Sequence, residues 1–414
     1  MTMDRRQFLA ASALATPLLT ASAAIPAAAV DTPAAEQARG PTTPAADRLA
    51  AQGWRSLAGR RVGVVSNPTG VLRDGTHVVD SMVAAGVRPV AVFGPEHGFR
   101  GTAQAGGSEG DYLDPRTQLP VYDTYGASAA TVAAQFRKAG VDTVVFDIAD
   151  VGARFYTYIW TMHTAMSAAA GLDFVVLDRP NPIGGAVRGP RLDRAYASGV
   201  GREPIAQQHG MTVGELARLF AGEFLKTPEP TVERVTGWRR DQLFTDTDLS
   251  WVPPSPNMPT PQTALVYPGT CLFEGTTFSE GRGTTRPFEI IGAPGVDWRW
   301  ADALNALGLP GVRFREHYFV PTFGKFAGSA CGGVQVHVTD ERRFEAIDTA
   351  VAMIVTARRE AFSWRPDNFI DKLTGSDRLR RMVDAGAGVA DVTGAWAAEL
   401  AEFRQVRESY LLYR

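Results

Sequence analysis

The chain has 414 residues, of which 45% are hydrophobic and 21% are charged, and its formal net charge is −2. This near-neutral, ordinary soluble composition gives no electrostatic reason to expect binding to nucleic acid or to a membrane surface. The two cysteines, Cys271 and Cys331, are too few for a disulfide framework; they either pair outside the cytoplasm or are two unrelated buried thiols.

The first 45 residues differ from the rest of the chain. Arg5 and Arg6 precede a long stretch of Ala, Leu and Thr, and Ala27–Ala29 offers small residues for cleavage. This pattern predicts a twin-arginine signal peptide over residues 1–29, with an uncleaved anchor or a disordered tail as the alternatives. Residues 30–45 have almost no large apolar side chains and predict a disordered linker. We therefore expect a periplasmic or extracellular protein with no stable membrane insertion after signal cleavage.

Residues 46–245 alternate between strand-like and helix-like patterns. Four apolar runs predict strands buried on both faces: Arg61–Ser66, Pro89–Phe93, Thr143–Phe146 and Phe174–Leu177. Helices are predicted over 76–85, 128–139, 159–170 and 211–225, the first three ending at a glycine and the last beginning with Thr212 and Glu215 at capping-box spacing. This order predicts a Rossmann-like, doubly wound α/β domain with a mostly parallel sheet.

Residues 246–414 predict a smaller α+β domain. The stretch 252–284 is rich in proline and glycine and has few helical signals. Helices are predicted over 298–307, 343–360, 377–385 and 395–412, and strands near 312–320 and 333–338.

Polar residues follow each of the four predicted strands, where ligands of parallel sheets bind, so we expect these residues to share one crevice. The sequence has no glycine-rich phosphate loop and no Gly-x-Gly-x-x-Gly after the first strand, so no nucleotide is expected. It also lacks His-Glu-x-x-His, Cys-x-x-Cys and Gly-x-Ser-x-Gly, and we expect neither a metal nor another cofactor. The surplus of carboxylates at strand ends favours glycoside hydrolysis, in which two carboxyl groups flank the bond.

The candidate catalytic groups are carboxylates at strand ends. Glu96 lies between a proline and a histidine after the second strand, a stiff position that suits general acid–base catalysis. The alternative is a glutamate that shapes its own loop by accepting backbone hydrogen bonds. Asp147 and Asp150 follow the third strand, and the alternative for either is an ion pair with Arg154.

Candidate substrate-binding residues surround these carboxylates. Tyrosine rings offer flat faces and hydroxyl groups to sugars, and arginines and acids offer charge-assisted hydrogen bonds. We expect substrate contacts from His97, Arg100, Arg154, Tyr156, Tyr158, Asp178, Arg179 and Asn181, and, in the second half, from Glu274, Glu280, Arg282 and Arg286. The alternatives are a structural role for His97 and a solvated loop over residues 279–289.

Five motifs in this order resemble one bacterial family, the NamZ-type exo-β-N-acetylmuramidases. They lie at residues 94–101, 146–158, 177–182, 254–259 and 273–284, and the resemblance covers essentially everything after the linker. It implies an exported enzyme that removes N-acetylmuramic acid from the non-reducing ends of peptidoglycan-derived oligosaccharides. It also implies a Rossmann-like domain without nucleotide, a smaller C-terminal domain with the site between them, and Glu96 as the catalytic acid/base.

Two other functions remain open at this point: a non-catalytic binder of cell-wall sugars, and a metallohydrolase that uses His97, Asp147 and Asp150. If the substrate is muramic acid, its lactyl carboxylate needs a cation, preferably the planar fork of an arginine. We expect this arginine to be Arg282 or Arg286, because both come from the second half and could close over the sugar.

Overall fold

The computed structural model describes residues 40–358 and 362–414. The predicted signal peptide, and the predicted linker as far as residue 39, lie outside the described residues. Thr43 forms a β-bridge with Thr236, and helix α1 (Ala45–Ala51) begins two residues later, so the last residues of the predicted linker belong to the folded unit. None of the helices in the described part of the chain combines the length and the apolar character needed to cross a bilayer.

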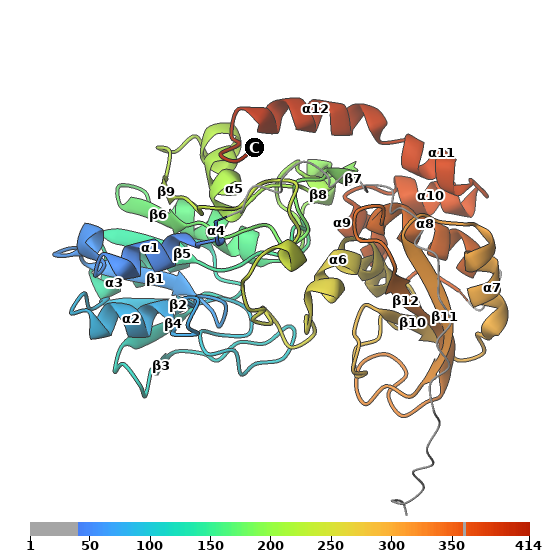
Figure 1. Ribbon diagram of the computed structural model, residues 1–414, viewed down its shortest axis with the longest axis horizontal. Helices are drawn as coiled ribbons and strands as arrows, with labels where there is room; N and C mark the ends of the chain where they lie inside the picture. The colour runs from blue at the N-terminus through green and yellow to red at the C-terminus, as the bar shows by residue number, and fades with distance from the viewer. Residues whose placement is uncertain (1–39, 359–361) are drawn as a thin grey trace, which may run out of the picture. The chain divides into compact units, whose positions relative to one another are not determined.

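The first half is built on a sheet of seven strands in the order β3-β4-β2-β1-β5-β6-β9 (Figure 1). All neighbours are parallel except β3 and β4. The strands are β1 (Val62–Ser66), β2 (Ala91–Gly94), β3 (Tyr112–Leu113), β4 (Pro120–Asp123), β5 (Thr143–Asp147), β6 (Asp173–Leu177) and β9 (Thr231–Glu233). The four predicted strands are confirmed and form the centre of the sheet, whereas the short and partly polar β3, β4 and β9 were not predicted.

Helices cover both faces of this sheet, as a doubly wound fold requires. Val64 packs in one core and its neighbour Val65 in the other, because successive side chains of a strand point to opposite faces. The helices of one face are α1 and α2 (Val78–Ala84), and those of the other are α3 (Ala129–Ala139), α4 (Tyr158–Ala168) and α5 (Val213–Leu219). Burial on both faces explains why the central strands are apolar throughout.

The helix ends follow the local sequence signals. Thr212 and Glu215 form the predicted capping box of α5, which continues into a π-helical turn, Phe220–Leu225. Gly140 ends α3 in the left-handed conformation at φ 71°, which glycine adopts without steric cost.

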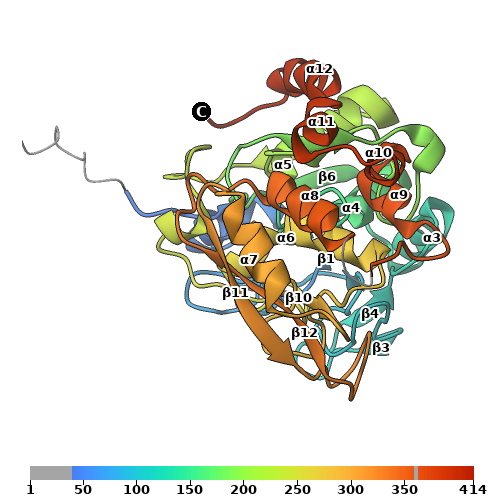
Figure 2. The same ribbon diagram turned by 90° about the vertical axis from the view of Figure 1, so that its right-hand side faces the viewer.

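The second half contains a small antiparallel sheet in the order β10-β12-β11. Its strands are β10 (Ile290–Ala293), β11 (Val312–Phe319) and β12 (Cys331–Val338). Its helices are α6 (Pro261–Thr270), α7 (Trp298–Ala306), α8 (Ala346–Ala357), α9 (Phe369–Thr374), α10 (Arg378–Asp384), α11 (Val389–Gly394) and α12 (Ala397–Glu408). Helix α7 packs on β11 and β12, and α8 packs on α6 and α7 (Figure 2). The observed layout is the predicted Rossmann-like α/β sheet with a smaller α+β part.

The end of the chain returns to the first half, beside α5 (Figure 1). The backbone N–H of Leu412 donates to Glu215 at 2.7 Å, and the hydroxyl of Tyr413 donates to Asp178 at 2.6 Å. A two-stranded ladder of β7 (Arg188–Arg191) and β8 (Ala206–Gln208) contacts α12 and α9. Both halves therefore belong to one compact unit, residues 40–414.

Candidate active site

Two neighbouring cavities meet at Glu96. One, the Glu274 cavity, has a volume of about 120 Å³ and is lined by residues from both halves of the chain. The other, the Arg202 cavity, has a volume of about 420 Å³ and lies over the start of α4. Glu96, Thr157 and Val200 line both cavities, so a molecule that spans them passes the carboxylate of Glu96.

The carboxylate of Glu96 is held in place by two neutral donors. Its Oε1 accepts a hydrogen bond from the backbone N–H of Gly106 at 2.8 Å, and its Oε2 accepts one from the hydroxyl of Thr157 at 2.9 Å. The side chain keeps 17% of its surface exposed. Glu96 is therefore oriented and still accessible, the combination that acid–base catalysis needs.

His97 turns its ring towards Glu96. Its Nδ1 lies 2.9 Å from the carbonyl oxygen of Ala103, which can only accept, so Nδ1 donates. The other ring nitrogen, Nε2, faces Glu96 at 4.0 Å from Oε1. His97 itself is in the left-handed region at φ 72°, a strained conformation of the kind that clusters at functional sites. His97 also lines the Glu274 cavity, and its expected contact with substrate stays a prediction.

The second half contributes a second carboxylate. Glu274, in a 3₁₀ turn over Cys271–Gly275 after α6, lines the Glu274 cavity opposite the loop of Glu96. Its Oε1 accepts a hydrogen bond from Arg282 at 2.8 Å. Burial raises the pKa of Glu274, and the positive charge of Arg282 opposes that shift. The cavity therefore holds two carboxyl groups with different surroundings.

The other charged residues of the loop over residues 279–289 are already paired. Glu280 lies 3.4 Å from Arg282 and 3.0 Å from Lys325, so it closes an ion-pair network behind the cavity. Arg286 pairs with Glu289 at 3.1 Å and lines neither cavity beside Glu96. These two arginines were expected to bind a lactyl carboxylate. Arg286 lines neither cavity beside Glu96, and Arg282 pairs with both Glu274 and Glu280.

Tyrosines form one wall of the Glu274 cavity. Tyr156 contacts Tyr158 and Tyr267 edge to face, with ring centroids 5.1 and 5.6 Å apart. The hydroxyl of Tyr158 donates to the carbonyl oxygen of Pro254 at 2.5 Å, so this ring is fixed to the second half. Burial raises the pKa of both Tyr156 and Tyr158. Both predicted tyrosines lie at the cavity.

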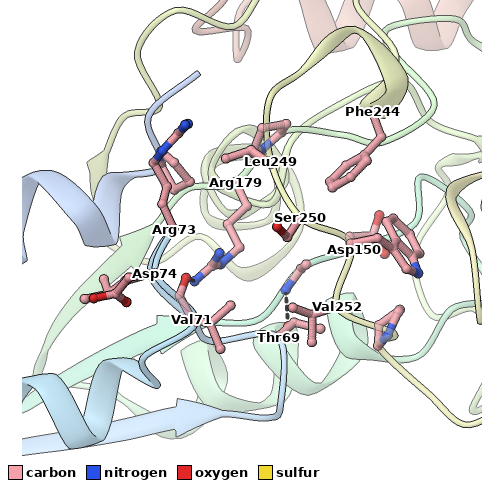
Figure 3. A pocket seen from close by; sticks show the side chains of 17 residues that line it. Thr69, Val71, Arg73, Asp74, Asp150, Arg179, Phe244, Leu249, Ser250 and Val252 are labelled. Carbon is pink, nitrogen blue, oxygen red and sulfur yellow. Dashed lines mark hydrogen bonds between the residues drawn. The ribbon is translucent and has the colours of Figure 1, made fainter. Parts of the chain in front are cut away.

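Thr69, Asp150 and Arg179 do not line either cavity beside Glu96, contrary to the expected single crevice, although they follow β1, β5 and β6. They surround a third cavity of about 240 Å³, the Asp150 cavity, shown in Figure 3 with Thr69, Asp150 and Arg179 around it. The backbone N–H of Ala149 donates to the hydroxyl of Thr69, and Arg179 donates to the carbonyl oxygen of Val71. The loop after β1 thus lies over the exits of β5 and β6 and belongs to this separate cavity.

Asp147 and Asp150 are consequently not positioned as partners of Glu96. Asp147 is fully buried, and Arg179 donates to both of its oxygens at 2.5 and 2.9 Å. Asp150 lies 3.0 Å from the ring of His209 and accepts the N–H of Gly152 at 2.8 Å. This geometry corrects the catalytic role expected for both aspartates, because Asp147 is paired with Arg179 and neither aspartate lines a cavity beside Glu96.

The structure also corrects the expectation that Arg154 binds substrate. It is fully buried and donates to the carbonyl oxygens of Pro190, Ile205 and Leu373, so it neither pairs with Asp150 nor faces a cavity. Burial lowers its pKa to about 9. Arg154 ties the first half to α9 and is structural.

Three further residues expected to bind substrate have structural partners. Arg100 pairs with Asp80 and Asp114 at 3.0 and 2.9 Å. Asp178 accepts hydrogen bonds from α5 and from the chain end, and Asn181 donates to the carbonyl oxygen of Met211. Their polar groups shape loops and do not line either cavity beside Glu96.

Several residues of the site were missed from the sequence: Thr157, Thr161, Thr164, Tyr125 and Arg202 line the Arg202 cavity. The three threonines follow one another at helical spacing, four and then three residues apart, on one face of α4. A polar stripe on an otherwise apolar helix is a pattern from which these threonines could have been predicted to line a site. Tyr125 and Arg202 lie in loops without a motif.

Cys271 and Cys331 are both free and buried. In the described part of the chain, no group of three or more His, Cys, Asp or Glu residues is placed to hold a metal ion. The ligands considered for a metallohydrolase are separated, since His97 lies beside Glu96, whereas Asp147 pairs with Arg179 and Asp150 lines the Asp150 cavity.

Two family models match nearly the whole described chain. The model of the N-terminal part of the exo-β-N-acetylmuramidase NamZ matches residues 62–262, and that of its C-terminal part matches residues 265–413. The chain belongs to the NamZ family of exo-β-N-acetylmuramidases. Both sides of the Glu274 cavity fall within these matches.

Similar proteins agree with the NamZ assignment. The chain is 45% identical over 367 residues to the peptidoglycan β-N-acetylmuramidase NamZ of Bacillus subtilis strain 168, covering 87% of this chain and 88% of that protein. It also resembles crystal structures of two DUF1343 family proteins of Bacteroides fragilis NCTC 9343. One has a TM-score of 0.82 and 32% identity, over 90% of this chain and 99% of its own. The other has a TM-score of 0.73 and 31% identity, over 91% and 99%.

Proposed function

We propose that this protein is an exo-acting glycoside hydrolase that releases N-acetylmuramic acid from the non-reducing ends of peptidoglycan fragments. The observation that carries the proposal is Glu96, an accessible carboxylate held by Gly106 and Thr157 where two cavities meet. A glycosidic bond needs such a group at its oxygen and space for a sugar on either side. Membership of the NamZ family supports the choice of sugar.

The two carboxyl groups of the Glu274 cavity have surroundings suited to different roles. Glu96 accepts hydrogen bonds from neutral donors and faces a histidine, so it can give a proton to the leaving oxygen and take one back. Burial raises the pKa of Glu274, and the charge of Arg282 opposes that shift and so favours the carboxylate form that a base or nucleophile requires. Glycosidases divide their chemistry between two carboxyl groups in this way.

The test is release of free N-acetylmuramic acid from a chromogenic β-N-acetylmuramide, with and without a chelator. Hydrolysis that is insensitive to the chelator supports the proposal. Binding without hydrolysis would instead indicate a cell-wall sugar-binding protein. Loss of activity on chelation, restored by metal, would indicate a metallohydrolase.

We further propose that the enzyme works outside the cytoplasm and is exported by the twin-arginine route. The support is in the sequence: Arg5 and Arg6, the apolar stretch behind them, and the polar segment that follows. Replacing both arginines with lysine should retain active enzyme inside the cell. Unchanged export of the double variant would contradict the proposal.

A further inference from the structure

Arg202 has no counter-charge in the described part of the chain. It lines the Arg202 cavity, is partly buried, and donates from Nη1 to the hydroxyl of Thr164 at 2.6 Å. Among residues 40–358 and 362–414, no carboxylate lies within ion-pair distance of its guanidinium. Burial accordingly lowers the pKa of Arg202, with no opposite charge to offset the effect.

The nearest acid in the sequence is already engaged. Glu203 pairs with Arg194 at 2.6 Å and lies 3.4 Å from the ring of His163. The other arginine beside Glu96, Arg282, is bonded to Glu274 and lies close to Glu280. Among the described residues that line the two cavities, Arg202 is thus the arginine that has no carboxylate partner. A partly buried guanidinium of this kind suits a carboxylate ligand.

Helix α4 connects Arg202 and Glu96 through two threonines. Thr157 binds the carboxylate of Glu96, and Thr164 binds Arg202, seven residues further along the same helix. At roughly 1.5 Å per residue the two threonines are about 10 Å apart along the helix axis. A ligand that reaches from Glu96 to Arg202 therefore has to extend along this face of α4.

The walls of the Arg202 cavity suit a sugar ring between these two ends. Thr161 lies on the same face of α4, between Thr157 and Thr164, and offers a hydroxyl group. Tyr125, which follows β4, is 40% exposed and offers a ring face. At about 420 Å³ this cavity is larger than the Glu274 cavity.

We infer that Arg202 binds the lactyl carboxylate of the terminal N-acetylmuramic acid, and that the Arg202 cavity holds that sugar with its anomeric oxygen at Glu96. The inference rests on the proposed function and assigns its specificity. Arg202 replaces Arg282 and Arg286 as the residue expected to bind the lactyl carboxylate, because Arg282 holds Glu274 and Arg286 lies outside both cavities.

The test compares two chromogenic β-N-acetylmuramides that differ only in the lactyl group, one a free acid and the other its methyl ester. Wild type should prefer the acid. Arg202→Ala should lower kcat/KM for the acid by about 30- to 1000-fold, the range for truncating one partner of a desolvated charge pair, and should change the ester far less. Arg202→Lys should retain part of the preference. Arg299→Ala, an exposed arginine on α7, is the matched control and should behave as wild type.

Other outcomes would contradict either this inference or the proposed function. A preference for the acid that survives in Arg202→Ala, or that is lost only in Arg282→Ala, would overturn the inference, as would equal rates on both substrates in wild type. Hydrolysis of neither substrate by wild type would count against the proposed function. Calorimetric titration with free N-acetylmuramic acid and its methyl ester would then still decide the role of Arg202, since only the acid should bind more weakly to Arg202→Ala.

Discussion

Glu96 differs from the other acids of the strand exits in what surrounds its carboxylate. It accepts hydrogen bonds from an amide and a hydroxyl, whereas Asp147 is neutralised by Arg179 and Asp150 adjoins His209. A carboxyl group with neutral donors can exchange a proton with substrate, while an aspartate locked to a guanidinium cannot do so without breaking a buried ion pair. The chemistry is therefore expected to depend on Glu96.

We predict that Glu96→Gln folds normally but lowers kcat by roughly 10²- to 10⁴-fold on a muramic acid glycoside with a poor leaving group, because no proton reaches the departing oxygen. A good leaving group needs little protonation and should suffer less. Steady-state kinetics on both glycosides measures this, with thermal unfolding as the control for folding. Near-normal kcat with the poor leaving group would remove Glu96 from the mechanism.

Arg282 is expected to set the pH range in which Glu274 works. Its charge lowers the pKa of Glu274 against the effect of burial, so Arg282→Ala should raise that pKa. If Glu274 acts as a carboxylate, more of it is then protonated at a given acidic pH, and the acidic limb of kcat/KM moves to higher pH. Arg282→Lys keeps the charge and should move the limb less. A uniform loss at every pH would mean that Arg282 only shapes the loop.

At the scale of elements, the loop after β2 is built around a left-handed glycine. Gly98 has φ 89°, and a Cβ there would come within 2.2 Å of Glu109. Glu109 in turn accepts from the N–H groups of Arg100 and Thr102 and from the hydroxyl of Tyr112. The segment that carries Glu96 thus depends on the close approach of Gly98 to Glu109.

We predict that Gly98→Ala lowers the free energy of unfolding by about 1–3 kcal/mol and also reduces kcat, because the loop must shift. Gly110→Ala is the matched control: Gly110 has φ 72°, but a Cβ there meets nothing within 4 Å. Denaturant unfolding and kinetics of both variants separate backbone strain from the clash. Equal effects in the two variants would show that the contact with Glu109 is unimportant.

The burial of an element determined how well the sequence predicted it. The central strands are apolar throughout because both faces are covered, so their runs identified them, and the capping box of Thr212 marked α5. Helix α6 was missed because it begins at Pro261 and contains Pro268, so its composition favoured a loop. Glu96 was predictable from its place after β2, but the separation of Asp147 from it depends on the loop after β1, which no local pattern reveals.

At the scale of the whole molecule, the chain end is fastened to the sheet through a buried carboxyl group. Burial raises the pKa of Asp178 to about 6, although donors that include Tyr413 and the N–H of Gly214 lower it. An unfolded aspartate titrates near pH ~3.9, so between about pH 4 and 6 the folded protein binds more protons than the unfolded chain. The contribution of Asp178 to stability therefore decreases as the pH rises through that window.

We predict that Tyr413→Phe raises the pKa of Asp178 further, so that the loss of stability is larger at pH 8 than at pH 5. The loss at pH 8 should be about 1–3 kcal/mol, the cost of leaving a buried acceptor without its donor. Tyr410→Phe removes a hydroxyl that binds the exposed Glu223, and as the control it should change stability by less than about 0.5 kcal/mol. Equal losses for Tyr413→Phe at both pH values would refute the linkage to Asp178.

The most direct measurement offers the purified enzyme two disaccharides of opposite order, N-acetylmuramic acid β-linked to N-acetylglucosamine and the reverse, and identifies the released sugars by mass spectrometry. The expected result is free N-acetylmuramic acid from the first disaccharide only, and no release by Glu96→Gln in the same time. Release from the second disaccharide, or equal release by Glu96→Gln, would contradict exo-acting muramidase chemistry at Glu96.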